Sequence, residues 1–225
     1  MYYSIAIDGP AGAGKSTIAR EIAKKIHFVY VDTGAMYRAM ALYFLRAGID
    51  GHDVERVSGE CPKIQVSLSY DEEIGQQVFL NGEDVTLYIR TEEVGNMASL
   101  TAAVPAVRAA LLDLQRNMAL STNILMDGRD IGTNVLPNAS LKIYLTASTA
   151  VRARRRYDEL RAKGIDCDLS QIEQDIIDRD YQDMHREIAP LKMAEDAVLV
   201  DSSDMTIEQV VDTVIAQYNK LIMPE

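Results

Sequence analysis

The chain has 225 residues, a formal net charge of −11 at pH 7, and 48% hydrophobic and 25% charged residues. This length allows one substantial core with insertions, and the composition is that of a globular protein. The acidic balance disfavours a nucleic acid polymer as partner, because sequence-independent affinity for it needs a basic surface. No apolar run approaches the roughly 18 residues that cross a bilayer, and no export signal precedes the first polar residues. We therefore expect a cytoplasmic protein with no membrane partner.

The first 50 residues alternate between β-prone and helical patterns. Residues 3–7 are β-prone, and a glycine-rich turn separates them from isoleucines at helical spacing within residues 18–26. Residues 28–31 predict a second strand. Residues 35–47 predict a helix that ends at Gly48, because glycine is common just beyond a helix.

The middle of the chain differs in character. Residues 66–86 alternate like strands, and the pair Asn81-Gly82 within them is a hairpin signal. Pro105 suits the first turn of a helix whose apolar face extends to Met118. We expect a small β-rich insertion followed by a helix.

Three short apolar segments, residues 123–127, 141–145 and 197–201, read as core strands. The chain closes with an amphipathic helix, and Thr206 and Gln209 before it are spaced as a capping box. Strands that alternate with helices predict an α/β fold, with a parallel sheet flanked by helices and ligands at the carboxyl ends of the strands.

A phosphate-binding motif lies between the first strand and the first helix. Residues 9–16 read Gly-Pro-Ala-Gly-Ala-Gly-Lys-Ser and satisfy G-x-x-x-x-G-K-[ST] in the context that this motif requires. Lys15 is expected to reach the β- and γ-phosphates of ATP, and the Ser16 hydroxyl to ligate Mg²⁺. The alternative is a glycine-rich turn without a ligand. The expected ATP-binding residues here are Gly9, Pro10, Ala11, Gly12, Ala13, Gly14, Lys15, Ser16 and Thr17.

The sequence argues against a guanine-nucleotide switch. No Asp has a Gly three residues later, so the D-x-x-G element is missing, and the pair Asn219-Lys220 is followed by Leu-Ile rather than by x-Asp.

Residues 32–38 read Asp-Thr-Gly-Ala-Met-Tyr-Arg and, with I-D-G-P-A-G-A-G-K-S-T at the start, resemble bacterial cytidylate kinases, which are P-loop nucleoside monophosphate kinases. The similarity continues through residues 89–94, 127–132 and 179–191, in the expected order over nearly the whole chain. It implies a P-loop core with a β-rich acceptor-binding insertion and a helical lid. It also implies transfer of the γ-phosphate of ATP to CMP or dCMP in pyrimidine metabolism, with Mg²⁺, by a monomer. The expected division is core at 1–57, insertion at 58–96, core at 97–150, lid at 151–180 and core at 181–225.

The resemblance also implies a set of CMP-binding residues, most of which are arginines, carboxylates or hydroxyl-bearing side chains. They are Asp32, Thr33, Tyr37, Arg38, Ser99, Arg108, Arg129, Asp130, Arg179, Asp183 and Arg186. Arginine forks suit phosphate oxygens, and a carboxylate suits the cytosine amino group. Alternatively, Asp32 and Thr33 cap a helix while Arg38, Ser99 and Arg108 lie on ordinary helix surfaces.

Within residues 171–188, the spacing of Ile172, Ile176, Arg179, Asp183 and Arg186 places them on one face of a continuous helix. The first two residues of this stripe are apolar, and the last three are charged. Either the charges enter a polar cavity, or the buried stripe rotates onto neighbouring apolar residues, which are Ile177, Met184 and Ile188.

The remaining predictions concern the lid and Asp127. Arg152, Arg155 and Arg156 resemble lid arginines that close over ATP, or else they form a solvated face with i,i+4 pairs from Arg154 to Asp158 and from Arg155 to Glu159. Asp127 either approaches Mg²⁺ through water or merely ends a strand. The expected catalytic residues are Lys15, Arg129, Arg179 and Arg186.

Two other functions remain open at this point. One is a kinase for another small acceptor, such as UMP, AMP or a metabolite. The other is a non-catalytic ATP-binding regulator, against which the intact Lys15-Ser16 pair argues.

Overall fold

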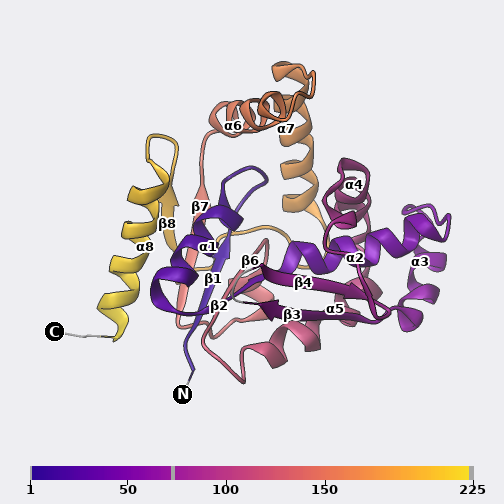
Figure 1. Ribbon diagram of the computed structural model, residues 1–225, viewed down its shortest axis with the longest axis horizontal. Helices are drawn as coiled ribbons and strands as arrows, with labels where there is room; N and C mark the ends of the chain where they lie inside the picture. The colour runs from indigo at the N-terminus through magenta and orange to yellow at the C-terminus, as the bar shows by residue number, and fades with distance from the viewer. Residues whose placement is uncertain (1, 72–73, 223–225) are drawn as a thin grey trace. The chain divides into compact units, whose positions relative to one another are not determined.

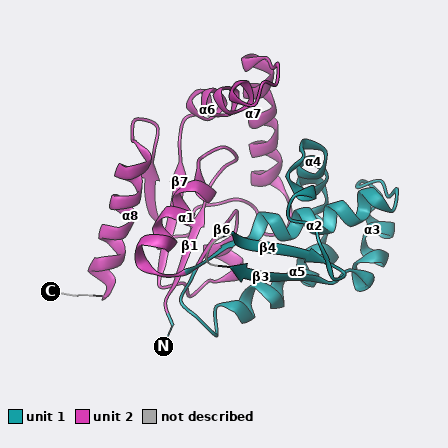
Figure 2. Ribbon diagram, viewed as in Figure 1, with its two compact units in different colours: residues 1–2, 29–124 teal, residues 3–28, 125–225 magenta. Residues whose placement is uncertain are grey.

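The computed structural model describes residues 2–71 and 74–222 (Figure 1). The chain forms two compact units (Figure 2). Unit 1 consists mainly of residues 29–124, and unit 2 consists of residues 3–28 and the chain from residue 125 onward. The five-part division expected from the sequence follows other limits and stays a prediction.

The central sheet has five strands in the order β2-β6-β1-β7-β8. Their bounds are β1 (Ser4–Asp8), β2 (Val29–Asp32), β6 (Ile124–Gly128), β7 (Leu141–Thr146) and β8 (Val198–Asp201). In unit 2, β7 pairs in parallel with β1, Ile5 opposite Leu141, and with β8, Ile143 opposite Val198. Strands β1 and β6 are almost wholly buried, as expected for a parallel sheet covered on both faces. The predicted α/β class is confirmed.

Unit 2 also contains helices α1 (Lys15–Ile26), α6 (Thr149–Ala162), α7 (Leu169–His185) and α8 (Ile207–Ile222); α1 and α8 lie beside its strands, and α6 packs on α7 (Figure 1). The capping box at the start of α8 is confirmed: Gln209 N–H donates to Thr206 Oγ1 at 3.2 Å, and Thr206 N–H donates to Gln209 Oε1 at 2.9 Å. A single π-helical turn, Ile131–Val135, follows β6.

Unit 1 contains helices α2 (Thr33–Arg46), α3 (Val54–Glu60), α4 (Glu92–Thr101) and α5 (Pro105–Met118). It also contains short 3₁₀ turns, Cys61–Lys63 and Tyr88–Arg90, and an antiparallel sheet of β3 (Val66–Asp71), β4 (Gly75–Leu80) and β5 (Glu83–Asp84). Its core is formed by apolar side chains of α2, β4 and α4, among them Ala39, Val78 and Ala98.

The local turn signals in unit 1 are confirmed. Asn81 and Gly82 join β4 to β5 with φ values of 50° and 86°, which glycine and asparagine adopt most readily. Pro105 is in the first turn of α5, where its missing N–H costs nothing. The β-rich insertion was therefore readable from the sequence.

No single helix in the described ranges is long and apolar enough to span a membrane, although α4 and α5 together meet that test across a 100° bend.

Candidate active site

The phosphate loop runs from the end of β1 to the start of α1. Gly9 has φ of 152°, and a Cβ there would lie 1.9 Å from the carbonyl oxygen of Leu145 in β7, so only glycine fits. Helix α1 has no acidic residue in its first turn, and no side chain from the described residues caps its amino end. Its first N–H groups therefore suit an anion. Thr17, also expected to bind ATP, donates its N–H to the Gly14 carbonyl at 3.1 Å.

Lys15 is buried beside this loop. Its Nζ donates to the Pro10 carbonyl at 2.8 Å. Burial lowers the pKa of Lys15, and the neighbouring Arg129 lowers it further, while the carboxylates of Asp127 and Asp183 act in the opposite direction. The pKa of this amine therefore responds to the local charge, and phosphate oxygens arriving nearby would raise it.

Ser16 and Asp127 lie in contact. The Ser16 hydroxyl donates to Asp127 Oδ2 at 2.9 Å, and Asp127 is buried at the end of β6. Hydroxyl and carboxylate oxygens are ligands for Mg²⁺, which keeps several waters and uses phosphate oxygens as well. Among the described residues, no group of three or more His, Cys, Asp or Glu side chains could hold a metal. The pair therefore fits Mg²⁺ that arrives with a nucleotide better than Mg²⁺ bound by protein alone.

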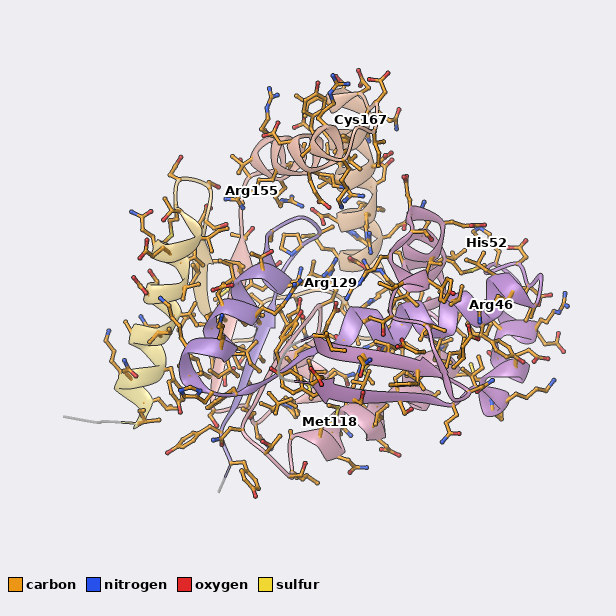
Figure 3. All side chains as sticks on the ribbon, in the orientation of Figure 1. Arg46, His52, Met118, Arg129, Arg155 and Cys167 are labelled. Atoms are coloured by element: carbon orange, nitrogen blue, oxygen red, sulfur yellow. The ribbon has the colours of Figure 1, made fainter. Side chains whose placement is uncertain are left out.

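A network of arginines and carboxylates occupies the same unit. Arg129, labelled in Figure 3, follows β6 directly, and its Nε donates to Asp183 Oδ2 of α7 at 2.8 Å. Arg186 donates from Nη2 to Asp130 Oδ1 at 3.1 Å, and its Nη1 lies 3.8 Å from Asp183 Oδ1. These two pairs join the segment after β6 to the end of α7.

The charges of this network shift the pKa values of its members. Burial alone would raise the pKa of Asp183, but Arg129, Arg179 and Arg186 hold it below its usual value. Burial alone would lower the pKa of Arg129, but Asp183 raises it overall. Asp183 therefore remains ionised, and the arginines are held together near it rather than extended into solvent.

The exposed fractions of side chains on α7 decide between the two interpretations of its stripe. Ile172 and Ile176 are each 8% exposed and Asp183 is 6% exposed, whereas Ile177 is 45% exposed and Met184 is 44% exposed. The rotated stripe is therefore wrong, and the charged residues continue the buried face. The continuous helix ends one residue early, because α7 stops at His185 and Arg186 is its C-cap.

In unit 1, the side chain of Asp32 acts as a helix cap. Its Oδ1 accepts the Ala35 N–H at 3.0 Å at the start of α2, and its Oδ2 pairs with Arg90 Nη1 at 2.9 Å. The capping alternative for Asp32 is thus confirmed, and Thr33 beside it is 2% exposed. The carboxylate therefore already has protein partners on both oxygens.

Arg38 folds back along α2 toward its amino end. A Cβ at Gly34 would lie 3.6 Å from Arg38 Nη1, so the missing side chain leaves room for this guanidinium over the first turn. The combination of a helix amino end and an arginine fork suits a phosphate group.

Arg108 and Ser99 do not lie on an ordinary helix surface. Arg108 is 7% exposed, and its guanidinium lies 5.6 Å from the centre of the Tyr37 ring. The Ser99 hydroxyl oxygen is buried with no hydrogen-bond partner among the described residues. A buried hydroxyl without a partner is costly, and a polar ligand atom would satisfy it.

The arginines that were expected to close over ATP have protein partners. Arg155 donates to the Ser202 carbonyl at 2.7 Å, and Arg156 pairs with Glu159 at 3.0 Å. Glu159 also binds Lys163, so the predicted pair between Arg155 and Glu159 is wrong. Arg152 is buried and uses four of its five N–H donors within the protein, so its expected contact with ATP does not fit its environment.

The comparisons with known proteins agree with one another. A family model described as cytidylate kinase matches residues 5–220. The chain belongs to the cytidylate kinase family. It is 47% identical to a cytidylate kinase of Alkaliphilus metalliredigens over 97% of both chains, and 50% identical to that of Pelotomaculum thermopropionicum over 95% of both.

Similarity to solved structures shows the fold. An uncharacterised protein from Eubacterium ventriosum has a TM-score of 0.55 at 8% identity, covering 96% of this chain and 98% of that chain. This likeness agrees with the α/β architecture described above.

Two buried groups of this cytidylate kinase family member were missed from the sequence. The Asp8 carboxylate accepts the N–H groups of Ile131 at 2.8 Å and Gly132 at 2.7 Å, which ties the start of the phosphate loop to the segment after β6. Burial raises the pKa of Asp8 to about 6, despite these hydrogen bonds and the nearby Lys15. Its position just before the first loop glycine was the available signal.

The second missed group is Asp180 on α7. Its Oδ1 accepts the Ala11 N–H at 3.1 Å, and its Oδ2 lies 2.5 Å from Arg152 Nη1, which also donates to the Ala11 carbonyl at 2.8 Å. We call Arg152, Asp180 and Ala11 the loop latch. Both polar groups of the Ala11 backbone are held by one buried ion pair.

Proposed function

We propose that this protein transfers the γ-phosphate of ATP to CMP or dCMP, giving ADP and CDP or dCDP. The observation that carries the proposal is the arginine–carboxylate network of unit 2, which includes Arg129 and Asp183 and lies on the same sheet as the phosphate loop. Membership of the cytidylate kinase family supports the same reaction.

The transfer step needs charge compensation more than base catalysis. An ionised oxygen of the CMP phosphate attacks the γ-phosphorus, the bond to the β–γ bridging oxygen breaks, and ADP leaves with that electron pair. Because the attacking oxygen is already ionised, no strong general base is required. Lys15, Arg129, Arg179 and Arg186 supply positive charge to the donor and acceptor phosphates and to the phosphoryl group in transfer.

Mg²⁺ would be held by Ser16 and by Asp127, directly or through water, and when bound it neutralises phosphate charge. Ser16 and Asp127 orient each other through their hydrogen bond at 2.9 Å. The hydroxyl is thereby held at the amino end of α1, where the phosphates bind.

The resemblance to cytidylate kinases supports the following roles toward the acceptor nucleotide. Arg38 binds its phosphate, and Ser99 satisfies its buried hydroxyl on the cytosine edge. Asp130 accepts from the cytosine amino group, and Asp183, whose low pKa keeps it ionised, accepts from the ribose hydroxyls. Tyr37 and Arg108, whose guanidinium lies over the Tyr37 ring, complete this set of residues.

We also propose that the protein acts as a cytoplasmic monomer. Cys61 and Cys167 are both free thiols, which suits a reducing compartment. Light scattering on the purified protein tests the monomer, and a mass twice that of the chain would contradict it.

The function is tested by ADP release from ATP in the presence of CMP, dCMP, UMP or AMP. We expect CMP or dCMP to give the highest kcat/KM, Lys15→Ala to abolish transfer, and Arg38→Ala chiefly to raise the KM for CMP. Arg161→Ala is the control, because its ion pair with Asp166, at 2.7 Å, is exposed at the surface. Release of ADP that does not depend on a pyrimidine monophosphate would refute the function, and a normal KM for CMP in Arg38→Ala would refute the role of Arg38.

A further inference from the structure

The side chain of Gln76 on β4 forms two hydrogen bonds with the backbone of Asp32. The Asp32 N–H donates to Gln76 Oε1 at 2.8 Å, and Gln76 Nε2 donates to the Asp32 carbonyl at 3.3 Å. One side-chain amide thus satisfies both polar groups of a single peptide position, 44 residues away in the sequence. A primary amide is suited to this double contact, because it presents one acceptor and two donors side by side.

Asp32 is the residue at which β2 ends and α2 begins. Its side chain is already committed to the Ala35 N–H and to Arg90, so its backbone is the part that Gln76 holds. The next turns of α2 carry Tyr37 and Arg38. Because a helix is stiff, the place and direction of its first residue determine where these two side chains lie.

The neighbouring residue Gln77 has a different environment on the same strand. Successive side chains of a strand point to opposite faces. Gln77 accepts from Ser69 Oγ at 2.9 Å and approaches Asp84 Oδ2 at 3.5 Å, both within the small sheet. Gln77 therefore offers a matched control: the same residue type, on the same strand, without contact to Asp32.

We propose that Gln76 is a positioning residue for the acceptor nucleotide. It acts through the backbone of Asp32, together with Arg90, whose ion pair with Asp32 spans 2.9 Å. The β-rich insertion thereby fixes the position of the amino end of α2, so that the Arg38 guanidinium and the first turn of α2 meet the acceptor phosphate. This proposal rests on the proposed function, because it assumes a nucleotide at α2.

The test compares Gln76→Met with Gln77→Met. Methionine keeps the unbranched length of glutamine and removes both hydrogen-bonding atoms. Gln76 borders a cavity of about 130 Å³ that is also lined by Val31 and Met118, the latter labelled in Figure 3, so the thioether has room. Steady-state KM values for CMP and for ATP, and the dissociation constant for CMP by calorimetry without ATP, are measured for wild type and both variants.

We expect Gln76→Met to raise the KM and the dissociation constant for CMP about tenfold, since two hydrogen bonds to a buried backbone are lost. The KM for ATP should change less than about twofold, and Gln77→Met should match wild type in every constant.

Thermal unfolding shows how much folded protein each variant retains, and the KM values and affinities then separate positioning from simple damage to the fold. A variant that only lost folded protein would show a lower kcat with unchanged KM values and calorimetric affinity, and this result would overturn the proposal. So would a wild-type affinity for CMP in Gln76→Met. Failure of the wild type to use CMP would instead refute the proposed function, which is a separate outcome of the same experiment.

Discussion

Breaking the loop latch should destabilise the protein by an amount that depends on whether one or both charges are removed. The side chains of Arg152 and Asp180 are 6% and 11% exposed. Asp180→Leu leaves the Arg152 guanidinium buried without its carboxylate, and Arg152→Met leaves the carboxylate without its guanidinium. Removing one partner of a buried ion pair costs about 3–5 kcal/mol.

The double variant distinguishes a paired charge from two independent contributions. If the two losses added, Arg152→Met/Asp180→Leu would lose about 6–10 kcal/mol, which is comparable to the whole stability of a typical domain. Since the double variant leaves no unpaired buried charge but removes the partners of the Ala11 N–H and carbonyl, we expect it to lose only about 1–3 kcal/mol. The coupling free energy between the two sites should therefore be about 3 kcal/mol or more.

Urea denaturation of the wild type, the two single variants and the double variant measures this coupling. The control cycle uses Arg161→Met and Asp166→Leu, whose side chains are 53% and 98% exposed although their atoms lie 2.7 Å apart. An exposed pair should show a coupling below about 1 kcal/mol. Losses at Arg152 and Asp180 that add to within about 0.5 kcal/mol would refute the reasoning.

Two further predictions use the buried polar groups Asp8 and Ser99. The pKa of Asp8 is about 6 in the folded protein against an ordinary value of 3.8, so the folded state takes up the proton at a higher pH than the unfolded state does. Between pH 7 and pH 5 the wild type should therefore gain about 1 kcal/mol of unfolding free energy relative to Asp8→Asn, which cannot titrate; a constant difference in urea titrations at both pH values would contradict this. Ser99→Ala should leave the unfolding free energy unchanged or raise it by about 1 kcal/mol, since it removes a buried hydroxyl without a protein partner, while the KM for CMP rises severalfold. Lower stability with an unchanged KM in thermal and kinetic assays would count against Ser99 as a ligand-binding residue.

Features encoded by neighbouring residues could be predicted from the sequence. The turn at Asn81-Gly82, the capping box of Thr206 and the glycine-rich loop each depend on a few adjacent positions, and each has the expected geometry. Helix α4 was missed because it is only ten residues long, so its apolar period is brief. Its best signal was Thr91, whose hydroxyl caps the Val94 N–H at 3.3 Å.

Contacts between distant residues could not be read from local patterns. Asp180 continues the spacing of Ile172 and Ile176, but its partners are 28 residues away in Arg152 and 169 residues away in Ala11. Charge alone therefore could not distinguish Arg152, which anchors the loop, from an arginine that meets a nucleotide. The residue types of the site were predictable, whereas the pairing of their charges needed the fold.

The first glycine of the phosphate loop has an evolutionary consequence. Its hydrogen faces the Leu145 carbonyl so closely that a methyl group could not be accommodated without moving a core strand. A descendant that had lost all affinity for nucleotides would thus still be selected to keep glycine at this position. Retention of Gly9 in a degenerate relative would consequently be poor evidence of catalysis, and the fate of Lys15 would be the informative character.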